Sequence, residues 1–324
     1  MKRLGVALAT IGLILGTTLA TQAQPSQAQT WPQRPVRFLV SLGPGSGADI
    51  AARLLAERLT VKWKQPVVVE NRPGGDAVIA ITAFIGAKDD HVLLYTPTSS
   101  FTAHPFQHAK VPYDLAELGP ITRVTNTLVG LVATPSLKID SVKDLVAQIK
   151  ANPGKMNYAT ATGMTDFIFE GYFKKAGLTI TRVPYRDVVG PITDVGEGRI
   201  QAYVGALAIV QPHVQSGRVK LIAITNTQRA PGYPDMPTVA EQGFPEMTFD
   251  GLIGLFGPRG MPQALRDRIA ADFKEALGDK TIASRLTATG QLINPGTSAE
   301  FAASMDEQRK TLAAIAERLG VKPQ

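Results

Sequence analysis

A glycine turn between a strand pattern and a helix pattern is the sequence feature that most restricts the fold. Residues 36–42 predict a buried strand, and residues 50–59 predict a helix. Between them, residues 43–49 read Gly-Pro-Gly-Ser-Gly-Ala-Asp. Glycine lets backbone N–H groups point into one concavity, and the helix that follows adds the positive end of its dipole. This unit therefore predicts an anion site that suits phosphate, sulfate or carboxylate equally well.

The first 28 residues have the pattern of a secretory signal peptide. Lys2 and Arg3 form a basic start, and residues 4–20 are apolar and uncharged. Small residues then allow cleavage after Ala23 or after Ala28. The apolar stretch is shorter than the roughly 20 residues that a membrane span prefers. We therefore expect export from the cytoplasm, with residues 1–28 as the signal peptide.

Charge and cysteine content exclude several partners and chemistries. Removal of Lys2 and Arg3 lowers the formal net charge from +7 to +5, because residues 1–29 contain no acidic residue. The remaining basic residues are scattered and lack interleaved aromatic residues, so we expect no nucleic-acid partner. The sequence contains no cysteine, which excludes disulfides, thiolate catalysis and cysteine-based metal sites.

Strand and helix patterns alternate along the rest of the chain. The strands are expected at 66–70, 91–95, 128–133, 157–159, 179–183, 202–204 and 221–224, and the helices at 77–86, 142–151, 165–175, 262–278 and 298–319. This alternation predicts an α/β fold with two lobes, each a mostly parallel sheet flanked by helices. Turns 43–49, 96–100 and 160–165 follow strands and carry small polar residues. Because ligands bind beyond the carboxyl ends of parallel strands, we expect these turns to line a cleft between the lobes.

The first turn also matches a dinucleotide-binding pattern. Gly43, Gly45 and Ala48 fit G-x-G-x-x-G/A, and Glu70 ends the next predicted strand, where a ribose-binding acid would stand. The predicted export and the lack of a clear catalytic acid or base oppose this interpretation. Bound nicotinamide or flavin in the purified protein would revive it. We expect a protein that is not an enzyme and needs no cofactor.

The histidines predict no metal site and no catalytic site. None of them lies at metal-ligand helical spacing from an acid, and Pro105 interrupts the segment between His104 and His108. No Gly-x-Ser-x-Gly nucleophile turn occurs. We therefore expect that His91, His104, His108 and His213 are structural or exposed.

Three aspartates have roles that the sequence leaves open. Asp49 can accept backbone N–H groups in the first turn of its helix, where it either caps the helix or orients the glycine turn. Thr165 can cap the helix expected at 165–175, with Asp166 in the first turn. The sequence does not decide whether Asp166 and Asp187 have a structural or a functional role.

Several long motifs follow one another along the expected mature chain. They are WPxRPVR at 31–37, PGSGAD at 44–49, PVVVENRPG at 66–74, VPYD at 111–114, ANPGKMNYA at 151–159, VPYR at 183–186 and PDMPTVAEQGFP at 234–245. With these motifs the chain resembles the extracytoplasmic solute-binding receptors of the tripartite tricarboxylate transporter family, also called TctC or Bug receptors.

The resemblance implies a two-lobed type II periplasmic-binding-protein fold, with residues 29–127 and 226–324 as lobe 1 and residues 128–225 as lobe 2. It implies a periplasmic receptor, expected to be a monomer, that closes around a small carboxylate and passes it to the membrane subunits of a tripartite tricarboxylate transporter. Carried over motif by motif, it implies that the ligand-binding residues are Gly43, Gly45, Ser46, Gly47, Ala48, Asp49, Thr98, Ser99, Ala161, Thr162, Gly163, Met164, Thr165, Val204 and Gly205.

Departures from the family pattern bear on which acid binds. Gly205 stands where the family often has aspartate, and Asp187-Val188-Val189 replace the usual glycines. Met164 adds an apolar side chain to the turn at 160–165. We therefore expect a carboxylate with an apolar body, either an aromatic acid or a dicarboxylate. The alternative is a co-receptor that presents its ligand to a membrane sensor kinase, and the neighbouring genes would distinguish the two.

Overall fold

The computed structural model describes residues 31–107, 110–161, 163–185 and 187–320. The predicted signal peptide and the predicted ligand residue Thr162 lie outside these ranges. The chain from Pro32 onward forms one compact unit. In the part of the chain that the structure describes, no helix combines the length and the apolar character that crossing a membrane requires.

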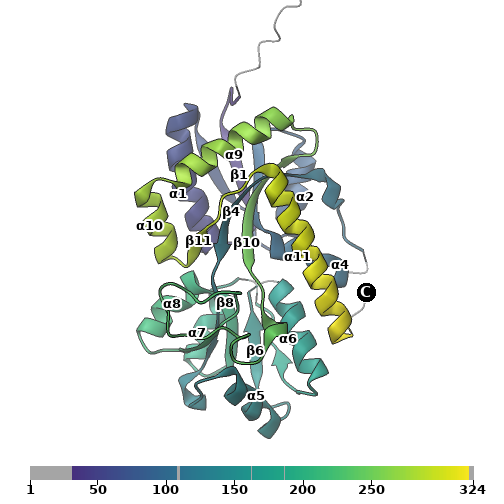
Figure 1. Cartoon of the computed structure of the whole chain (residues 1–324), viewed down its shortest axis with the longest axis vertical. Helices are drawn as coiled ribbons and strands as arrows, with labels where there is room; N and C mark the ends of the chain where they lie inside the picture. The colour runs from purple at the N-terminus through teal and green to yellow at the C-terminus, as the bar shows by residue number, and fades with distance from the viewer. Residues whose placement is uncertain (1–30, 108–109, 162, 186, 321–324) are drawn as a thin grey trace, which may run out of the picture. The chain divides into compact units, whose positions relative to one another are not determined.

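The first lobe is built on a six-stranded sheet with the order β11-β4-β10-β3-β1-β2 (Figure 1). Its strands are β1 (Val36–Val40), β2 (Val67–Asn71), β3 (Val92–Pro97), β4 (Leu118–Thr127), β10 (Gly251–Pro258) and β11 (Gln291–Ile293). The helices on it are α1 (Gly47–Trp63), α2 (Val78–Ala87), α3 (Thr98–Thr102), α4 (His104–Gln107), α9 (Gln263–Leu277), α10 (Lys280–Ala288) and α11 (Ser298–Leu319). Phe38 of β1 packs against Trp63 of α1 and Phe273 of α9, so these two helices cover one face of the sheet.

The second lobe is built on a five-stranded sheet with the order β7-β6-β8-β5-β9. Its strands are β5 (Val129–Ala133), β6 (Asn157–Thr160), β7 (Thr181–Arg182), β8 (Ala202–Ala206) and β9 (Lys220–Ile224). Its helices are α5 (Val142–Ala151), α6 (Gly163–Lys175), α7 (Gly190–Gly196) and α8 (Leu207–Gln215). The chain leaves the first sheet after Thr127 and returns to it at Gly251. The exact boundaries of the lobes stay a prediction.

Both sheets are mixed, and in each of them most strands run in one direction, as predicted. Strand β1 runs parallel to β2 and β3, whereas β10 runs antiparallel to both β3 and β4. In the second sheet β6 is parallel to β7 and β8, but β5 is antiparallel to β8 and β9. The reversed strands are β10 and β11 in the first sheet and β5 in the second, and β5 and β10 each follow a crossing between the sheets. A pattern of alternating strands and helices does not record the direction in which a chain re-enters a sheet.

Local signals located some helix ends and missed others. Helix α5 begins as predicted after Ser141, whose hydroxyl accepts the N–H of Asp144. Helix α6 begins at Gly163, so the prediction that Thr165 caps it was wrong, because Thr165 lies inside the first turn. The predicted loop 96–100 divides between the end of β3 and α3. Strands β4, β10 and β11 and the helices α3, α4, α7, α8 and α10 were not predicted.

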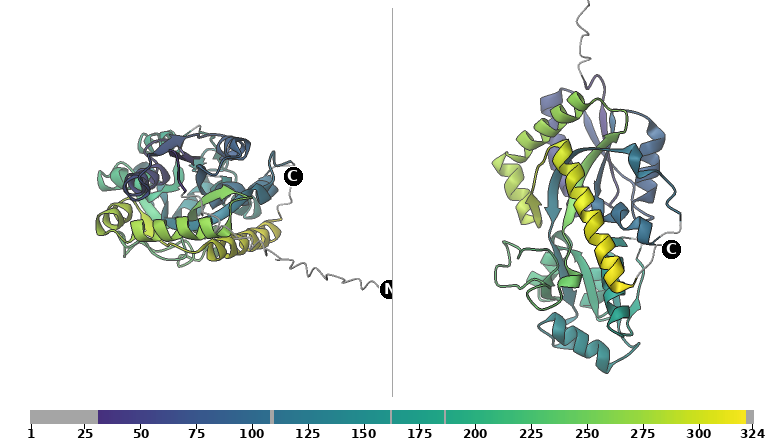
Figure 2. Two further views of the ribbon diagram at one scale, coloured as in Figure 1. Left: turned by 90° about the horizontal axis from the view of Figure 1, so that it is seen from above. Right: turned by 45° about the vertical axis from the view of Figure 1, so that its right-hand side comes forward.

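Helix α11 packs against both lobes. Its first half lies along β4, and its later half contacts α3 and α6 (Figures 1 and 2). Leu312, Ile315 and Ala316 belong to the same buried apolar cluster as Leu131 and Phe169 of the second lobe. The last helix therefore connects the lobes by packing, in addition to the two chain crossings.

Candidate functional site

The turn between β1 and α1 leaves two backbone N–H groups available at the start of the helix. Gly45, with a φ of +80°, donates its N–H to Asp49 Oδ2 at 3.0 Å, and the N–H of Ser46 binds the carbonyl of Gly43. The side chain of Ser46 caps the helix by accepting the N–H of Asp49 at 3.2 Å. The N–H groups of Gly47 and Ala48, in the first turn, have no intrahelical carbonyl to bind. Two of the glycine-turn N–H groups therefore hold the turn together, and the next two remain for an anion.

Asp49 orients this turn without adding uncompensated negative charge. Its carboxylate accepts the N–H of Gly45, the Asn71 amide at 2.9 Å and Arg53 at 2.9 Å. Burial raises the pKa of Asp49, but the hydrogen bonds from Arg53, Gly45 and Asn71 outweigh it and hold the pKa below its ordinary value. Asp49 is thus ionised, its charge is compensated by Arg53, and its hydrogen bonds hold the glycine turn in place. Its acceptance of a backbone N–H agrees with the prediction.

A small cavity of about 50 Å³ lies directly at the start of α1. Both lobes line it, and six of the predicted ligand residues do so: Ser46, Gly47, Ala48, Ser99, Ala161 and Thr165. Its remaining wall is largely apolar, with Val129, Ile209, Phe249 and Ile253 among its residues. The residues nearest the free N–H groups are therefore brought together from three separate parts of the chain.

Gln291 lines the same cavity and was missed by the sequence reasoning. Its side chain is fully buried, and its Oε1 accepts hydrogen bonds from Thr125 Oγ1 at 2.8 Å and Thr127 Oγ1 at 3.2 Å. The pairing of β11 with β4 places Gln291 opposite Thr127. No sequence signal could have located it, because its place depends on a short antiparallel strand near the end of the chain.

A larger cleft of about 930 Å³ adjoins the small cavity and shares Leu42, Ala161 and Val188 with it. Two further predicted residues, Gly43 and Gly163, line it. The other walls come from the turn at 73–77 of the first lobe and from residues 185–189, apart from 186, of the second. The two spaces together form one continuous candidate site between the lobes.

Charged residues in the larger cleft are mostly acidic. Asp166 accepts hydrogen bonds from Arg182 and from the hydroxyl of Thr160, and burial raises its pKa above the ordinary value despite these donors. Asp187 accepts the N–H groups of Val189 and Gly190 at 2.8 and 2.7 Å, at the start of α7. Arg182 is the one basic residue among the described residues that line the cleft, and it is already paired.

The turn before α2 has an unusual backbone. Gly74, Gly75, Asp76 and Ala77 have φ angles of +117°, +57°, +48° and +73°. The left-handed region costs a residue with a Cβ roughly 1–2 kcal/mol, so Asp76 and Ala77 are held there against their preference. This turn places Asp76 on the wall of the larger cleft, with its Oδ2 3.6 Å from His104 Nε2. Strain of this kind clusters at functional sites.

Several predicted ligand residues lie behind the site. Thr98 is fully buried and donates its hydroxyl to Gln308 Oε1 at 2.6 Å, and Met164 Sδ lies 3.8 Å from the Gln308 amide. These two residues therefore contact α11. The residues Gly45, Asp49, Thr98, Met164, Val204 and Gly205 line neither space.

Gly205 provides room for a tyrosine ring. A Cβ placed on Gly205 would lie 2.3 Å from the ring of Tyr203, whose hydroxyl donates to the carbonyl of Val188 at 2.7 Å. Val188 lines both the small cavity and the larger cleft. The absence of a side chain at 205 therefore lets Tyr203 hold the segment that closes one side of the site.

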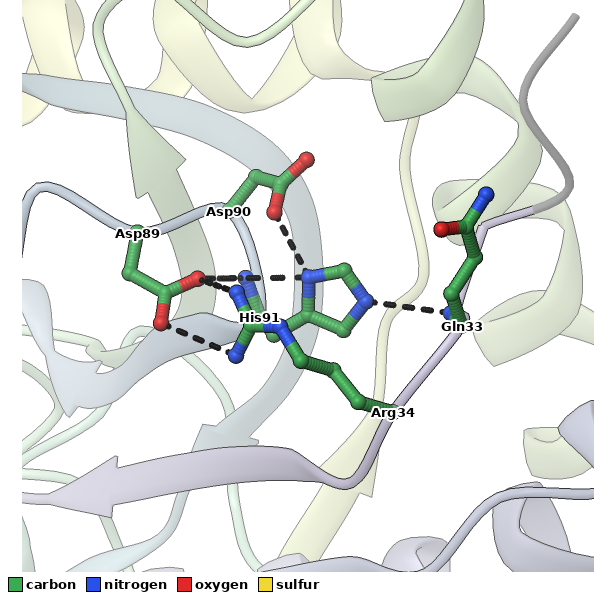
Figure 3. A network of polar contacts seen from close by, with 5 residues as sticks. All are labelled: Gln33, Arg34, Asp89, Asp90 and His91. Atoms are coloured by element: carbon green, nitrogen blue, oxygen red, sulfur yellow. Dashed lines mark hydrogen bonds and ion pairs between the residues drawn. The ribbon is translucent and has the colours of Figure 1, made fainter.

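Asp89, Asp90 and His91 lie close enough together to resemble a metal site, but their side chains make structural contacts with one another and with residues 33 and 34 (Figure 3). Arg34 donates two hydrogen bonds to Asp89, at 3.1 and 2.6 Å. His91 Nδ1 contacts Asp90 at 2.6 Å, and its Nε2 accepts the N–H of Gln33 at 3.2 Å. Both ring nitrogens and the Asp89 carboxylate are thus used within the fold, which agrees with the structural role expected of His91.

Comparison with known proteins places the chain among solute receptors. The family described as the tripartite tricarboxylate transporter family receptor matches residues 51–321. Protein BugT of Bordetella pertussis is 32% identical, over 87% of this chain and 88% of BugT. An adipate-bound protein of R. palustris is 24% identical, with a TM-score of 0.83 over 91% of this chain and 100% of the other. MatC of Rhodopseudomonas palustris, with bound malate, is 23% identical, with a TM-score of 0.80 over 88% and 99%.

These similarities confirm the predicted two-lobed type II fold. Solved periplasmic transport and binding proteins share it with TM-scores of 0.83 and 0.81.

Proposed function

The chain belongs to the tripartite tricarboxylate transporter family of receptors, and we propose on that premise that its cleft captures a small carboxylate by closure of the two lobes. The family consists of periplasmic solute-binding receptors, which are not enzymes. Two structural neighbours hold adipate and malate, which are both carboxylates, and this agrees with the proposal.

One observation carries the proposal: the start of α1 and residues of the opposite lobe line the same cavity. Gly47 and Ala48 offer N–H groups at the positive end of a 17-residue helix. Ala161 and Thr165 reach the same cavity from the second lobe. An anion bound there contacts both lobes. The anion therefore binds the closed arrangement more tightly than the open one and shifts the protein toward closure.

The donors favour a carboxylate held without a salt bridge. None of the described residues that line the small cavity carries a charge. Ser99 and Thr165 add hydroxyl groups to the two N–H groups, and both side chains are almost fully buried. A single planar anion with apolar neighbours matches this set of donors and the apolar wall.

The larger cleft favours an uncharged body over a second carboxylate. Asp76, Asp166 and Asp187 line it, and its one described basic residue is already paired with Asp166. A second carboxylate would meet like charges there, which opposes its binding. Of the two classes that the sequence favoured, we therefore propose an aromatic monocarboxylate ahead of a dicarboxylate.

Calorimetry with the mature protein tests this function. We expect benzoate to bind more tightly than adipate or malate. Binding of citrate or an amino acid alone would contradict the proposal. Gly47→Val should abolish binding, because a Cβ at Gly47 already lies 2.4 Å from Gln291 Nε2. Gly260→Ala is the matched control, since a Cβ there meets no atom within 4 Å, and it should bind like the wild type.

The location and the partner form the rest of the proposal. We propose that residues 1–28 are removed on export, and that the closed, monomeric receptor docks on the membrane subunits of a tripartite tricarboxylate transporter. Capture of those subunits by the receptor in the presence of its acid, but not in its absence, would support this partner.

A further inference from the structure

We propose that the side-chain amide of Gln291 is a ligand-binding donor that completes the carboxylate site, an inference that rests on the proposed function. The first observation is its burial. Gln291 has no exposed surface, yet its Nε2 has no hydrogen-bond partner in the structure. A buried polar group without a partner costs about 1–3 kcal/mol, and a ligand oxygen that accepts from Nε2 would remove this cost.

The second observation is that the amide has a fixed direction. Two hydroxyl groups, Thr125 Oγ1 and Thr127 Oγ1, donate to Oε1. With Oε1 held on that side, the amide nitrogen points the other way, toward Gly47. A Cβ on Gly47 would come within 2.4 Å of Nε2, so this nitrogen lies directly beside the helix start. The residue also lines the small cavity.

The N–H groups of Gly47 and Ala48 and the amide N–H of Gln291 therefore border one space. Each of the three can donate, and the cavity of about 50 Å³ has room for a carboxylate group, since a water molecule takes about 30 Å³ in the liquid. A carboxylate accepts several donors at once, through two oxygens. Asp49, the nearest acidic side chain on α1, is already bound by Arg53 and Asn71. The geometry thus fits an anion better than a neutral acceptor.

The same position gives Gln291 a role in specificity. Because its nitrogen is the end that faces the ligand, the site accepts a carboxylate and rejects an amide, whose own N–H groups would meet a donor. Gln291→Glu would keep an oxygen toward Thr125 and Thr127 and replace the donor by a second oxygen. Gln291→Met would keep the length of the side chain and remove both polar atoms.

Calorimetry with benzoate and benzamide tests this role. We expect Gln291→Met to bind benzoate about 10- to 100-fold more weakly than the wild type. We expect Gln291→Glu to bind benzoate still more weakly than Gln291→Met and to bind benzamide more tightly than the wild type. A purely structural role would not produce this reversal of preference. Gln148→Glu on α5 is the matched control for the change of charge, and it should keep the wild-type preference. Thermal melting of each variant shows whether it is folded.

The outcomes separate this inference from the proposed function. Equal benzoate affinity of the wild type and Gln291→Met would overturn the inference, with Nε2 then bound to a buried water, and would leave the proposed function standing. If benzoate, adipate and malate all fail to bind the wild type in calorimetry, the proposed function fails, and an NMR titration of the wild type with acetate decides the inference. The inference is supported if acetate shifts the Gln291 side-chain amide signals together with the N–H signals of Gly47 and Ala48. The Gln291 amide signals are assigned through their contacts with Thr125 and Thr127. If the Gln291 amide signals do not shift, the inference is overturned.

Discussion

Burial of the Asp166 side chain destabilises its charged form. Its side chain is 15% exposed, and desolvation raises its pKa in the folded protein above the unfolded value. The folded state therefore binds this proton more tightly than the unfolded state. The stability that Asp166 contributes is greatest at low pH, where both states are protonated, and falls as the pH rises through the folded pKa.

We expect Asp166→Asn to raise the melting temperature at pH 7, because the amide removes the penalty of burying a charge. Arg182 loses its partner but is 41% exposed, so water can solvate it. The difference from the wild type should close as the pH falls below about 4, where Asp166 is protonated in both states. Thermal melting from about pH 3 to pH 8 measures this difference.

Asp144→Asn provides a control of the opposite sign. Hydrogen bonds from Ser141 and the N–H of Asp140 lower the pKa of Asp144, so its charge stabilises the fold above the unfolded pKa. This variant should melt below the wild type at pH 7, with the difference again closing toward acid pH. A lower melting temperature for Asp166→Asn at pH 7 would show that the ion pair with Arg182 outweighs desolvation.

At the scale of elements, strand β8 holds the segment before α7 through one hydrogen bond. Tyr203 is fully buried and donates to the carbonyl of Val188, and burial raises its pKa, so the hydroxyl stays a donor at every physiological pH. We expect Tyr203→Phe to lower stability by about 0.5–1.5 kcal/mol. It should also weaken benzoate binding, because Val188 lines both parts of the site. Chemical denaturation and calorimetry measure the two effects.

Tyr233→Phe is the matched control for this element. The hydroxyl of Tyr233 is buried and has no hydrogen-bond partner, so its removal should leave stability unchanged or raise it. If Tyr203→Phe and Tyr233→Phe had the same effect on stability and on binding, the bond to Val188 would have no role in holding the segment.

The sequence predicts local features at this scale and misses those set by distant pairing. Helix α5 and the long helix α11 follow from their caps and their apolar spacing. Helix α1 follows the glycine turn as predicted, but it begins at Gly47 and ends at Trp63, beyond the predicted range 50–59 at both ends. Strands β10 and β11 escape prediction because their partners, β3 and β4, lie more than 100 residues earlier in the chain. The side of the small cavity at the start of α1 was therefore predictable, and the Gln291 side was not.

At the scale of the whole molecule, the two crossings between the lobes are tied to each other. Asn226, on the second crossing, accepts the N–H of Val129 at 2.8 Å and donates to the carbonyl of Thr127 at 3.0 Å. Its amide also donates to Asp250 Oδ1 at 3.1 Å. Strands β4 and β5 join between Thr127 and Val129. The lobes should therefore rotate about a single hinge at Thr127–Val129 and Asn226. The small cavity lies close to this hinge, and the larger cleft lies farther away.

Closure about this hinge can be measured directly, because the sequence contains no cysteine and two introduced cysteines can be labelled without background. Thr82 on α2 and Thr193 on α7 are exposed and belong to opposite lobes. We expect the distance between labels at Thr82→Cys and Thr193→Cys to shorten when benzoate is added, since both helices follow segments that line the larger cleft. Labels at Arg58→Cys and Thr82→Cys, both in the first lobe, should keep a constant distance. Shortening of the inter-lobe distance in a Gly47→Val background as well would mean that the closure does not depend on the start of α1.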